Sequence, residues 1–200
     1  EGFTMSPISI DTLLFAEFAA ASLLIAIGAP LGRLKMDQYI IMGLLFVPAY
    51  IFNEWLILDS GLFNGFVDTG GSIVIHAFGA YFGLGVVANT LSKFKDDADC
   101  ESNKNSNMLC LLGSMILWLF WPSFTSAVVA PERVVLTAIN TIFALCGATL
   151  ATYIFSKIIR GKLEIEDIAN AALAGGVAIG STCDMTTPGY AMIIGIAAGA

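Results

Sequence analysis

The chain has 200 residues, of which 57% are hydrophobic and only 12% are charged, and its mean hydropathy is +0.82. This balance excludes an ordinary water-soluble domain, in which about a quarter of the residues are charged, and indicates an integral membrane protein. The formal net charge of −7 excludes a nucleic-acid-binding protein, because phosphate contacts need clustered lysine and arginine side chains.

Long apolar runs, separated by short polar segments, follow one another along the chain. Because a transmembrane helix needs about 17 to 25 mainly apolar residues, we predict seven spans, at 11–32, 38–57, 69–92, 107–127, 132–158, 167–184 and 188–200. The last run is too short to cross a bilayer at about 1.5 Å per residue, and the chain begins with Glu1 instead of Met. We therefore expect an all-α polytopic membrane helix bundle, with residues 1–200 as a single transmembrane domain within a longer chain.

The distribution of basic residues predicts the orientation of these spans. Eight of the nine lysines and arginines lie in the loops after the first, third and fifth spans, and only Arg133 lies in the alternate loops. Short cytoplasmic loops are enriched in lysine and arginine. The N-terminus of the chain is therefore predicted to lie outside and the C-terminus inside, with the polar segment 93–107 as a cytoplasmic connector.

The third span contains the only histidine of the chain. His76 lies about eight residues, or roughly 12 Å, inside the start of the helix. An ionisable group at that depth normally faces a bundle interior or a water-filled path, and an imidazole offers both a donor and an acceptor to a passing polar solute. The alternative is a purely structural hydrogen bond to a neighbouring helix.

Two further features of the third span have alternative interpretations. Gly79 and Gly83 form a GxxxG pattern, which could leave a smooth wall beside His76 in a narrow lumen or allow another helix to pack closely. Asp68 precedes the helix, where a carboxylate caps free N–H groups. A carboxylate above a pore also contributes negative potential there, so the two roles of Asp68 can coexist.

Three separated motifs occur in order along the chain: DTGGSIVIHAFGAYFGL (68–84), LWLFWPSFTSA (117–127) and NAALAGGVAIGS (170–181), the last followed by TPG (187–189). Together they resemble the ammonium transporter superfamily, specifically its Rhesus (Rh glycoprotein) branch. The resemblance extends from about Asp11 to Ala200. It implies that the seven spans are the third to ninth helices of an eleven-helix fold, which assembles as a homotrimer with one pore per subunit.

The resemblance also implies four pore residues. Asp68 matches the buried acid near the outer mouth, and His76 matches the first of two pore histidines, the second belonging to a later helix. Phe18 and Phe124 match the stacked phenylalanines of a gate above the histidines. Without the resemblance, both would be ordinary packing or lipid-facing residues among the 14 phenylalanines of the chain.

Two positions differ from the bacterial and plant branch of that superfamily. Leu56 and Val128 stand where those transporters present a tryptophan and a serine to the incoming cation. The difference favours facilitated, bidirectional passage of ammonia over scavenging of ammonium. A bare ammonium ion has a large desolvation penalty in hydrocarbon, whereas neutral ammonia needs only a hydrogen-bond partner, which the imidazole of His76 supplies.

Other functions remain open at this point. Ammonium, methylammonium and carbon dioxide are alternative permeants. A membrane-bound ammonium sensor could use the same fold, with signalling domains outside this chain, and a scaffold subunit with a closed pore is a third possibility. The chain has one histidine and neither HExxH nor GxSxG, which argues against a zinc hydrolase or a serine protease; we predict no enzyme and no cofactor or metal.

Overall fold

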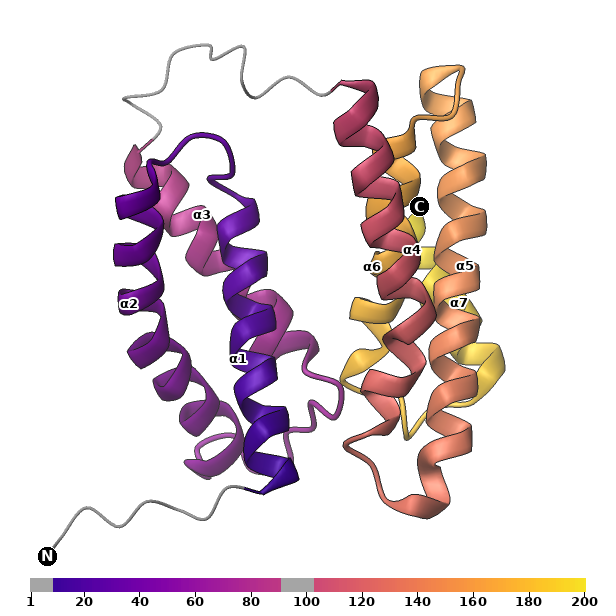
Figure 1. Ribbon diagram of the computed structural model, residues 1–200. Coiled ribbons are helices and arrows are strands. Elements are labelled where there is room, and N and C mark those ends of the chain that lie inside the picture. The colour runs from indigo at the N-terminus through magenta and orange to yellow at the C-terminus, as the bar shows by residue number, and fades with distance from the viewer. Residues whose placement is uncertain (1–8, 91–102) are drawn as a thin grey trace, which may run out of the picture. The chain divides into compact units, whose positions relative to one another are not determined.

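The computed structural model describes residues 9–90 and 103–200, and every regular element in those ranges is helical (Figure 1). The α-helices are α1 (Ile10–Gly28), α2 (Met36–Glu54), α3 (Phe78–Thr90), α4 (Lys104–Ser126), α5 (Val134–Arg160), α6 (Ile165–Gly180) and α7 (Pro188–Gly199). Wider π-helical turns extend α2 over Trp55–Asp59 and precede α3 over Ser72–Ala77, and a 3₁₀ turn, Pro131–Arg133, precedes α5. The predicted all-α class is confirmed.

Each of the seven predicted spans contains a helix. Four helical segments are long and apolar enough to cross a membrane: Met36–Asp59, Ser72–Thr90, Lys104–Ser126 and Pro131–Arg160. Two shorter apolar helices cover Thr12–Gly28 and Pro188–Gly199. Several such helices in one chain confirm the polytopic class. The predicted connector 93–107 lies mostly outside the described residues, and its last residues form the first turn of α4.

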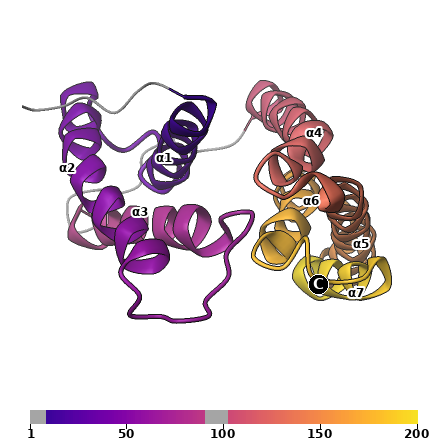
Figure 2. The same ribbon diagram turned by 90° about the horizontal axis from the view of Figure 1, so that it is seen from below.

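Contacts between residues group the chain into two compact units. In the described ranges, the first unit comprises residues 9–64 and 74–90 and therefore α1, α2 and α3 (Figures 1 and 2). The second comprises residues 65–73 and 103–200 and therefore α4 to α7. A single membrane domain over the whole chain stays a prediction, and the units are described separately below.

An aromatic cluster fills the core of the first unit. Phe46 and Tyr50 of α2 are almost fully buried, and their rings lie 5.5 and 5.9 Å from the ring of Phe78 at the start of α3. Phe82, one turn further along α3, meets Phe46 edge to face at 5.0 Å. Such edge contacts add to the stabilisation from apolar burial, so this cluster joins α2 to α3.

Small residues bring the helices of the second unit into backbone contact. The buried face of α5 includes Ala144 and Ala148, which are fully buried. A side chain at Gly175 of α6 or at Gly195 of α7 would collide with the Ala144 carbonyl oxygen. Close approach through small residues is the usual basis of helix packing in membranes, and it makes α5 the helix against which α6 and α7 pack.

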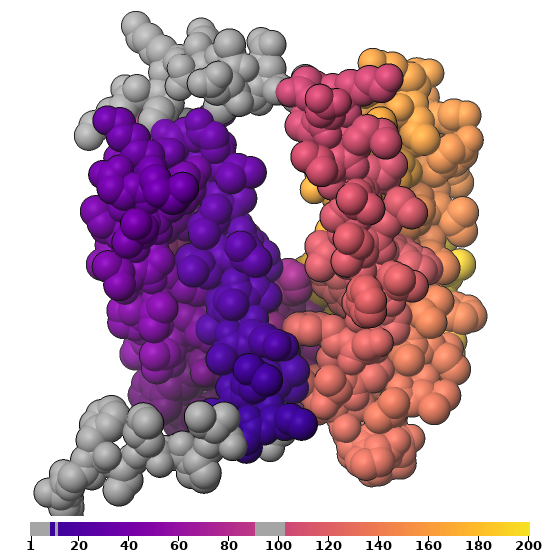
Figure 3. All heavy atoms as spheres, in the orientation of Figure 1, coloured from indigo at the N-terminus to yellow at the C-terminus, as the bar shows by residue number. Residues whose placement is uncertain are grey.

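The outer face of α4 is apolar. Figure 3 shows α4, in crimson to salmon, along the near face of the second unit. Its exposed side chains include Leu109, Leu112, Ile116 and Phe120. A helix surface of this kind suits hydrocarbon and not water, as expected for a membrane-spanning helix.

Candidate pore site

The four residues predicted to line a pore are divided between the two units. Phe18 and His76 belong to the first unit, and Asp68 and Phe124 belong to the second. Asp68 is 8% exposed and Phe18 is 6% exposed, whereas His76 and Phe124 are half-buried. None of the four is a freely solvated side chain.

Asp68 caps the helical segment that contains His76. Its Oδ2 atom accepts a hydrogen bond from the backbone N–H of Ile73 at 2.9 Å, and its Oδ1 atom accepts a short hydrogen bond from the Ser181 hydroxyl group. The first bond satisfies an N–H group that the helix itself leaves without a carbonyl partner. The capping role expected for Asp68 is thus present, together with a link to the end of α6.

The DTGGS segment is bound along its length to the C-terminal end of α6. The N–H of Gly70 donates to the carbonyl of Gly180 at 2.8 Å. The Ser72 hydroxyl donates to the Val177 carbonyl and accepts from the N–H of Ser181 at 2.8 Å. A Cβ atom at Gly70 would lie 2.9 Å from the Gly180 carbonyl oxygen. The first and third sequence motifs therefore meet through backbone contacts that a side chain at Gly70 would disrupt.

His76 lies on the π-helical turn Ser72–Ala77, immediately before α3. The two residues before it, Val74 and Ile75, are buried. The Ser22 hydroxyl of α1 donates to the Ile75 carbonyl at 2.7 Å, and the Asn53 side-chain amide of α2 donates to the Val74 carbonyl at 3.1 Å. Single π-helical turns within helices occur frequently at functional sites.

The GxxxG glycines of α3 pack against α1. A Cβ atom at Gly79 would lie 2.6 Å from the Ser22 carbonyl oxygen, and one at Gly83 would lie 2.6 Å from the Ala26 carbonyl oxygen. Both distances are too short for any side chain. Of the two interpretations of this pattern, helix packing is the one that the structure supports.

Phe18 lies one helical turn before Ser22 on α1. Residues four apart share a helix face, so Phe18 lies on the face of α1 that packs against α3. Its ring meets Phe15 edge to face, with ring centroids 5.8 Å apart. In the first unit, α1 therefore places an aromatic ring one turn away from the serine that contacts the His76 turn.

Phe124 lies in the last part of α4, beside two buried residues. Its neighbour Thr125 is fully buried and shares a 2.8 Å hydrogen bond between hydroxyl groups with Thr141 of α5. Trp121, one turn earlier, packs against Gly176 of α6. The residues around Phe124 thus anchor α4 to α5 and α6.

The two positions that differ from the bacterial and plant branch lie next to helix ends. Leu56 lies in the π-helical turn after α2 and is half-buried, and its carbonyl accepts from the Ser60 hydroxyl at 2.6 Å. Val128 follows α4 and is also half-buried. In the same unit as Val128, Arg133 pairs with Asp184 at 3.3 Å, and Asp184 accepts from the Thr69 hydroxyl at 2.9 Å.

Sequence reasoning missed the polar residues that hold these segments, chiefly Ser22, Asn53 and Ser181. Each has a side chain bonded to a group more than twenty residues away along the chain. The available signal was a polar residue within or directly after an apolar run. That signal marks a side chain in need of a partner but does not identify the partner.

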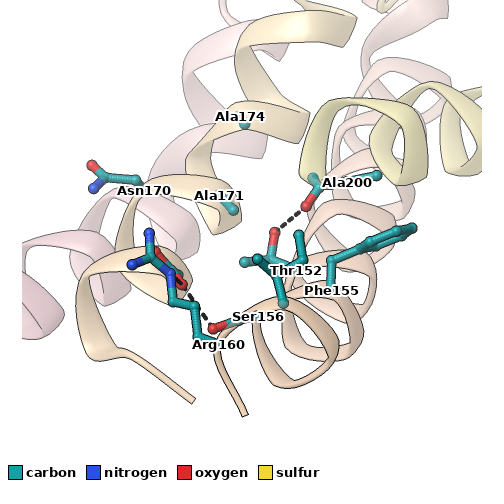
Figure 4. Close-up of a pocket in the computed structure, with 11 residues that line it drawn as sticks. Thr152, Phe155, Ser156, Arg160, Asn170, Ala171, Ala174 and Ala200 are labelled. Atoms are coloured by element: carbon teal, nitrogen blue, oxygen red, sulfur yellow. Dashed lines mark hydrogen bonds and ion pairs between the residues drawn. The ribbon is translucent and has the colours of Figure 1, made fainter. Parts of the chain in front are cut away.

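The hollow drawn in Figure 4 contains none of the predicted site residues. It lies in the second unit, between α5 and α6, with a volume of about 390 Å³. Asp167 accepts a hydrogen bond there from the Ser156 hydroxyl at 2.7 Å and forms an ion pair with Arg160, with 2.9 Å between Arg160 Nε and Asp167 Oδ2. Its carboxylate is thus already paired with protein groups. Within the described ranges, no group of three or more histidine, cysteine, aspartate or glutamate side chains is arranged to hold a metal ion.

The fold and the site together define a polytopic helical membrane protein with a half-buried histidine inside an apolar span. The chain belongs to the Ammonium Transporter Family, whose model matches residues 3–200. This is a family of transporters and not of enzymes, and the resemblance found in the sequence is confirmed.

The relatives and solved structures similar to the chain include several of the Rh type. It is 40% identical over 201 residues to ammonium transporter Rh type B of Xenopus tropicalis, covering 96% of this chain and 42% of that protein. It is 41% identical over 200 residues to ammonium transporter Rh type A of Rattus norvegicus, covering 96% and 44%. The chain thus spans less than half the length of these curated relatives.

Two solved structures share the fold. One, described as Nitrosomonas europaea Rh50 and the mechanism of conduction by the Rhesus protein family of channels, matches with a TM-score of 0.92 and 53% identity, over 99% of this chain and 53% of that one. The other, described as a sensor Amt protein, matches with a TM-score of 0.72 and 28% identity, over 91% and 49%. The chain is therefore more similar to the Rhesus channel structure than to the sensor.

Proposed function

We propose that this chain forms part of an Rh-type membrane channel that facilitates the passage of ammonia. The observation that carries the proposal is His76, the only histidine of a chain in this family, half-buried on a π-helical turn inside an apolar segment. An imidazole in such surroundings offers a hydrogen bond to a neutral polar solute while the apolar walls disfavour a cation. The names of the Rh-type relatives support ammonium or ammonia as the permeant.

The other three residues have distinct roles in this proposal. Asp68 holds the outer start of the helix and adds negative potential at the mouth, which raises the local concentration of cations. Phe18 and Phe124 form the aromatic gate above His76. Leu56 and Val128, in place of a tryptophan and a serine, leave no cation-binding site at the outer mouth.

The assembly and orientation form part of the same proposal. The subunit assembles as a homotrimer with one pore in each subunit. The N-terminal end of the chain faces outside, because eight of its nine basic residues then lie in cytoplasmic loops. Methylammonium and carbon dioxide are further candidate permeants of the same channel.

A flux measurement on the full-length protein in liposomes tests the function. Liposomes that contain the protein should alkalinise faster inside after an ammonium pulse than empty liposomes, without conducting potassium. His76→Ala should lower the ammonia flux by about tenfold, the factor equivalent to about 1.4 kcal/mol of lost hydrogen bonding, or should let water fill the lumen and abolish the discrimination against potassium.

The matched control for this variant is Tyr81→Phe, on the same helix. Tyr81 is 75% exposed, so removal of its hydroxyl group should change neither flux nor selectivity. If well-folded wild-type protein alkalinises liposomes no faster than empty ones do, the channel function is wrong.

An ammonium sensor is the second candidate, and the sensor Amt structure favours it. A sensor should bind ammonium to the purified full-length protein without accelerating alkalinisation. Isothermal titration with ammonium chloride, with sodium chloride as the control, separates this candidate from a channel.

A further inference from the structure

The two carbonyl groups that precede His76 both receive hydrogen bonds from side chains of other helices. The donor to Ile75 is the hydroxyl group of Ser22, at 2.7 Å in a buried contact. The donor to Val74 is the side-chain amide of Asn53, at 3.1 Å. The donors come from α1 and α2, so two separate helices contact the same turn of backbone.

A π-helical turn needs such donors more than an α-helical turn does. In a π-helical turn each carbonyl pairs with the N–H five residues later, instead of four residues later as in an α-helix. Where the π-helical turn ends and α-helical pairing begins along the chain, a carbonyl group can therefore lack an N–H partner. In a bilayer no water is available for such a group, and leaving one without a donor costs several kcal/mol. We therefore expect side-chain donors at the Val74 and Ile75 carbonyl groups to favour the wide turn over the α-helix.

The packing of the first unit places the Ser22 donor. Ser22 is 0% exposed, and its hydroxyl oxygen would lie only 3.1 Å from a Cβ atom at Gly79. The absence of a side chain at Gly79 is what allows α1 to come close enough for the hydroxyl to reach the Ile75 carbonyl. The same glycine therefore serves both the helix contact and the hydrogen bond.

We propose that Ser22 and Asn53 are positioning residues that hold the π-helical turn open and thereby set the direction of the His76 side chain. The inference rests on the proposed role of His76 in the pore. One residue of an α-helix corresponds to about 100° of rotation about the axis. Return of this turn to α-helical pairing would move His76 by up to that angle relative to the Gly79 face of α3.

The test is the selectivity of the full-length channel carrying Ser22→Ala. With the turn relaxed, the ratio of ammonia flux to methylamine flux in liposomes should change by about three- to tenfold, the range that one hydrogen bond of ordinary strength represents. Ser114→Ala is the matched control, because the buried Ser114 hydroxyl donates to the Ala169 carbonyl of another helix at 2.8 Å in the unit without His76. It should reduce stability to a similar degree and leave the flux ratio unchanged.

A double-mutant cycle separates positioning from general damage. In a His76→Ala background, Ser22→Ala should change the flux ratio no further, since the group being positioned is gone. An equal change in both backgrounds, or an unchanged ratio in Ser22→Ala alone, would overturn the proposal. Asn53→Leu removes the second donor and keeps a side chain of similar volume, so it should shift the flux ratio in the same direction. This variant replaces Ser22→Ala in the test if the Ser22→Ala protein does not fold.

A cryo-electron-microscopy structure of the Ser22→Ala protein gives a readout independent of transport. We expect residues 72–77 to lose π-helical pairing and His76 to rotate. A retained π-helical turn with His76 unmoved refutes the positioning role even if the wild-type protein conducts no ammonia. A wild-type protein that conducts no ammonia would count against the proposed function alone, and not against the positioning role.

Discussion

Replacement of Asp68 tests whether its carboxylate joins the third span to the end of α6. The side chain is only 8% exposed and accepts from two donors, the Ile73 N–H and the Ser181 hydroxyl. Loss of a helix cap costs about 1 kcal/mol, and loss of a hydrogen bond to a charged group costs about 1.5–3 kcal/mol. Asp68→Ala should therefore destabilise the protein by about 2.5–4 kcal/mol.

Asp68→Asn should cost less, about 1–2 kcal/mol, because the amide keeps one acceptor oxygen and the Ser181 hydroxyl can rotate to accept from the amide nitrogen. The assay is the unfolding of the full-length protein in mixed SDS and mild-detergent micelles. Asp37→Ala is the control: Asp37 also lies in the first turn of a helix but is exposed. Its loss should cost less than about 1 kcal/mol.

A double-mutant cycle that combines Asp68→Ala with Ser181→Ala tests whether Ser181 is the partner of the Asp68 carboxylate. The coupling between Asp68→Ala and Ser181→Ala should be about 1–2 kcal/mol, as for residues in direct contact. Additive effects of the two substitutions, or equal stability of the Asp68→Ala and Asp37→Ala proteins, would refute the reasoning.

Two further predictions concern packing and topology. Gly195→Ala should destabilise the protein by about 1–3 kcal/mol, because the new methyl group collides with the Ala144 carbonyl. Gly189→Ala is the control and should leave the stability unchanged, because the space around Gly189 is open. Equal unfolding midpoints of the two variants would contradict this prediction. In an otherwise cysteine-free protein, an impermeant maleimide added outside should label a cysteine at Asp59 but not one within 93–102; the reverse pattern would overturn the proposed orientation.

The positions of the helices could be predicted from the sequence because membrane helices are determined locally. A span in hydrocarbon must satisfy its own backbone hydrogen bonds and present apolar side chains, and both requirements can be read from one run of residues. For this reason, the helix α7, Pro188–Gly199, coincides with the apolar run at 188–200; that this run crosses the membrane stays a prediction. The capping role of Asp68 was also predictable, since an aspartate just before a helix lies within reach of the free N–H groups at its start, here that of Ile73, five residues further along the chain.

Local sequence did not show that Ser72–Ala77 is a π-helical turn, because the same apolar residues suit an α-helix equally well. That choice depends on donors from α1 and α2, and Ser22 lies 53 residues from Ile75 along the chain. Likewise, GxxxG permitted either a lumen wall or a helix contact until α1 was seen against Gly79.

The sequence by itself determined which segments are helical, which of them are apolar, and the family to which the chain belongs, because hydropathy and motifs are properties of neighbouring residues. Only the tertiary structure decided that Ser181, 113 residues away, bonds to Asp68, and that Ser22 and Asn53 contact the turn before His76. A polar side chain in an apolar span must find a partner, but the identity of that partner depends on which helices pack together.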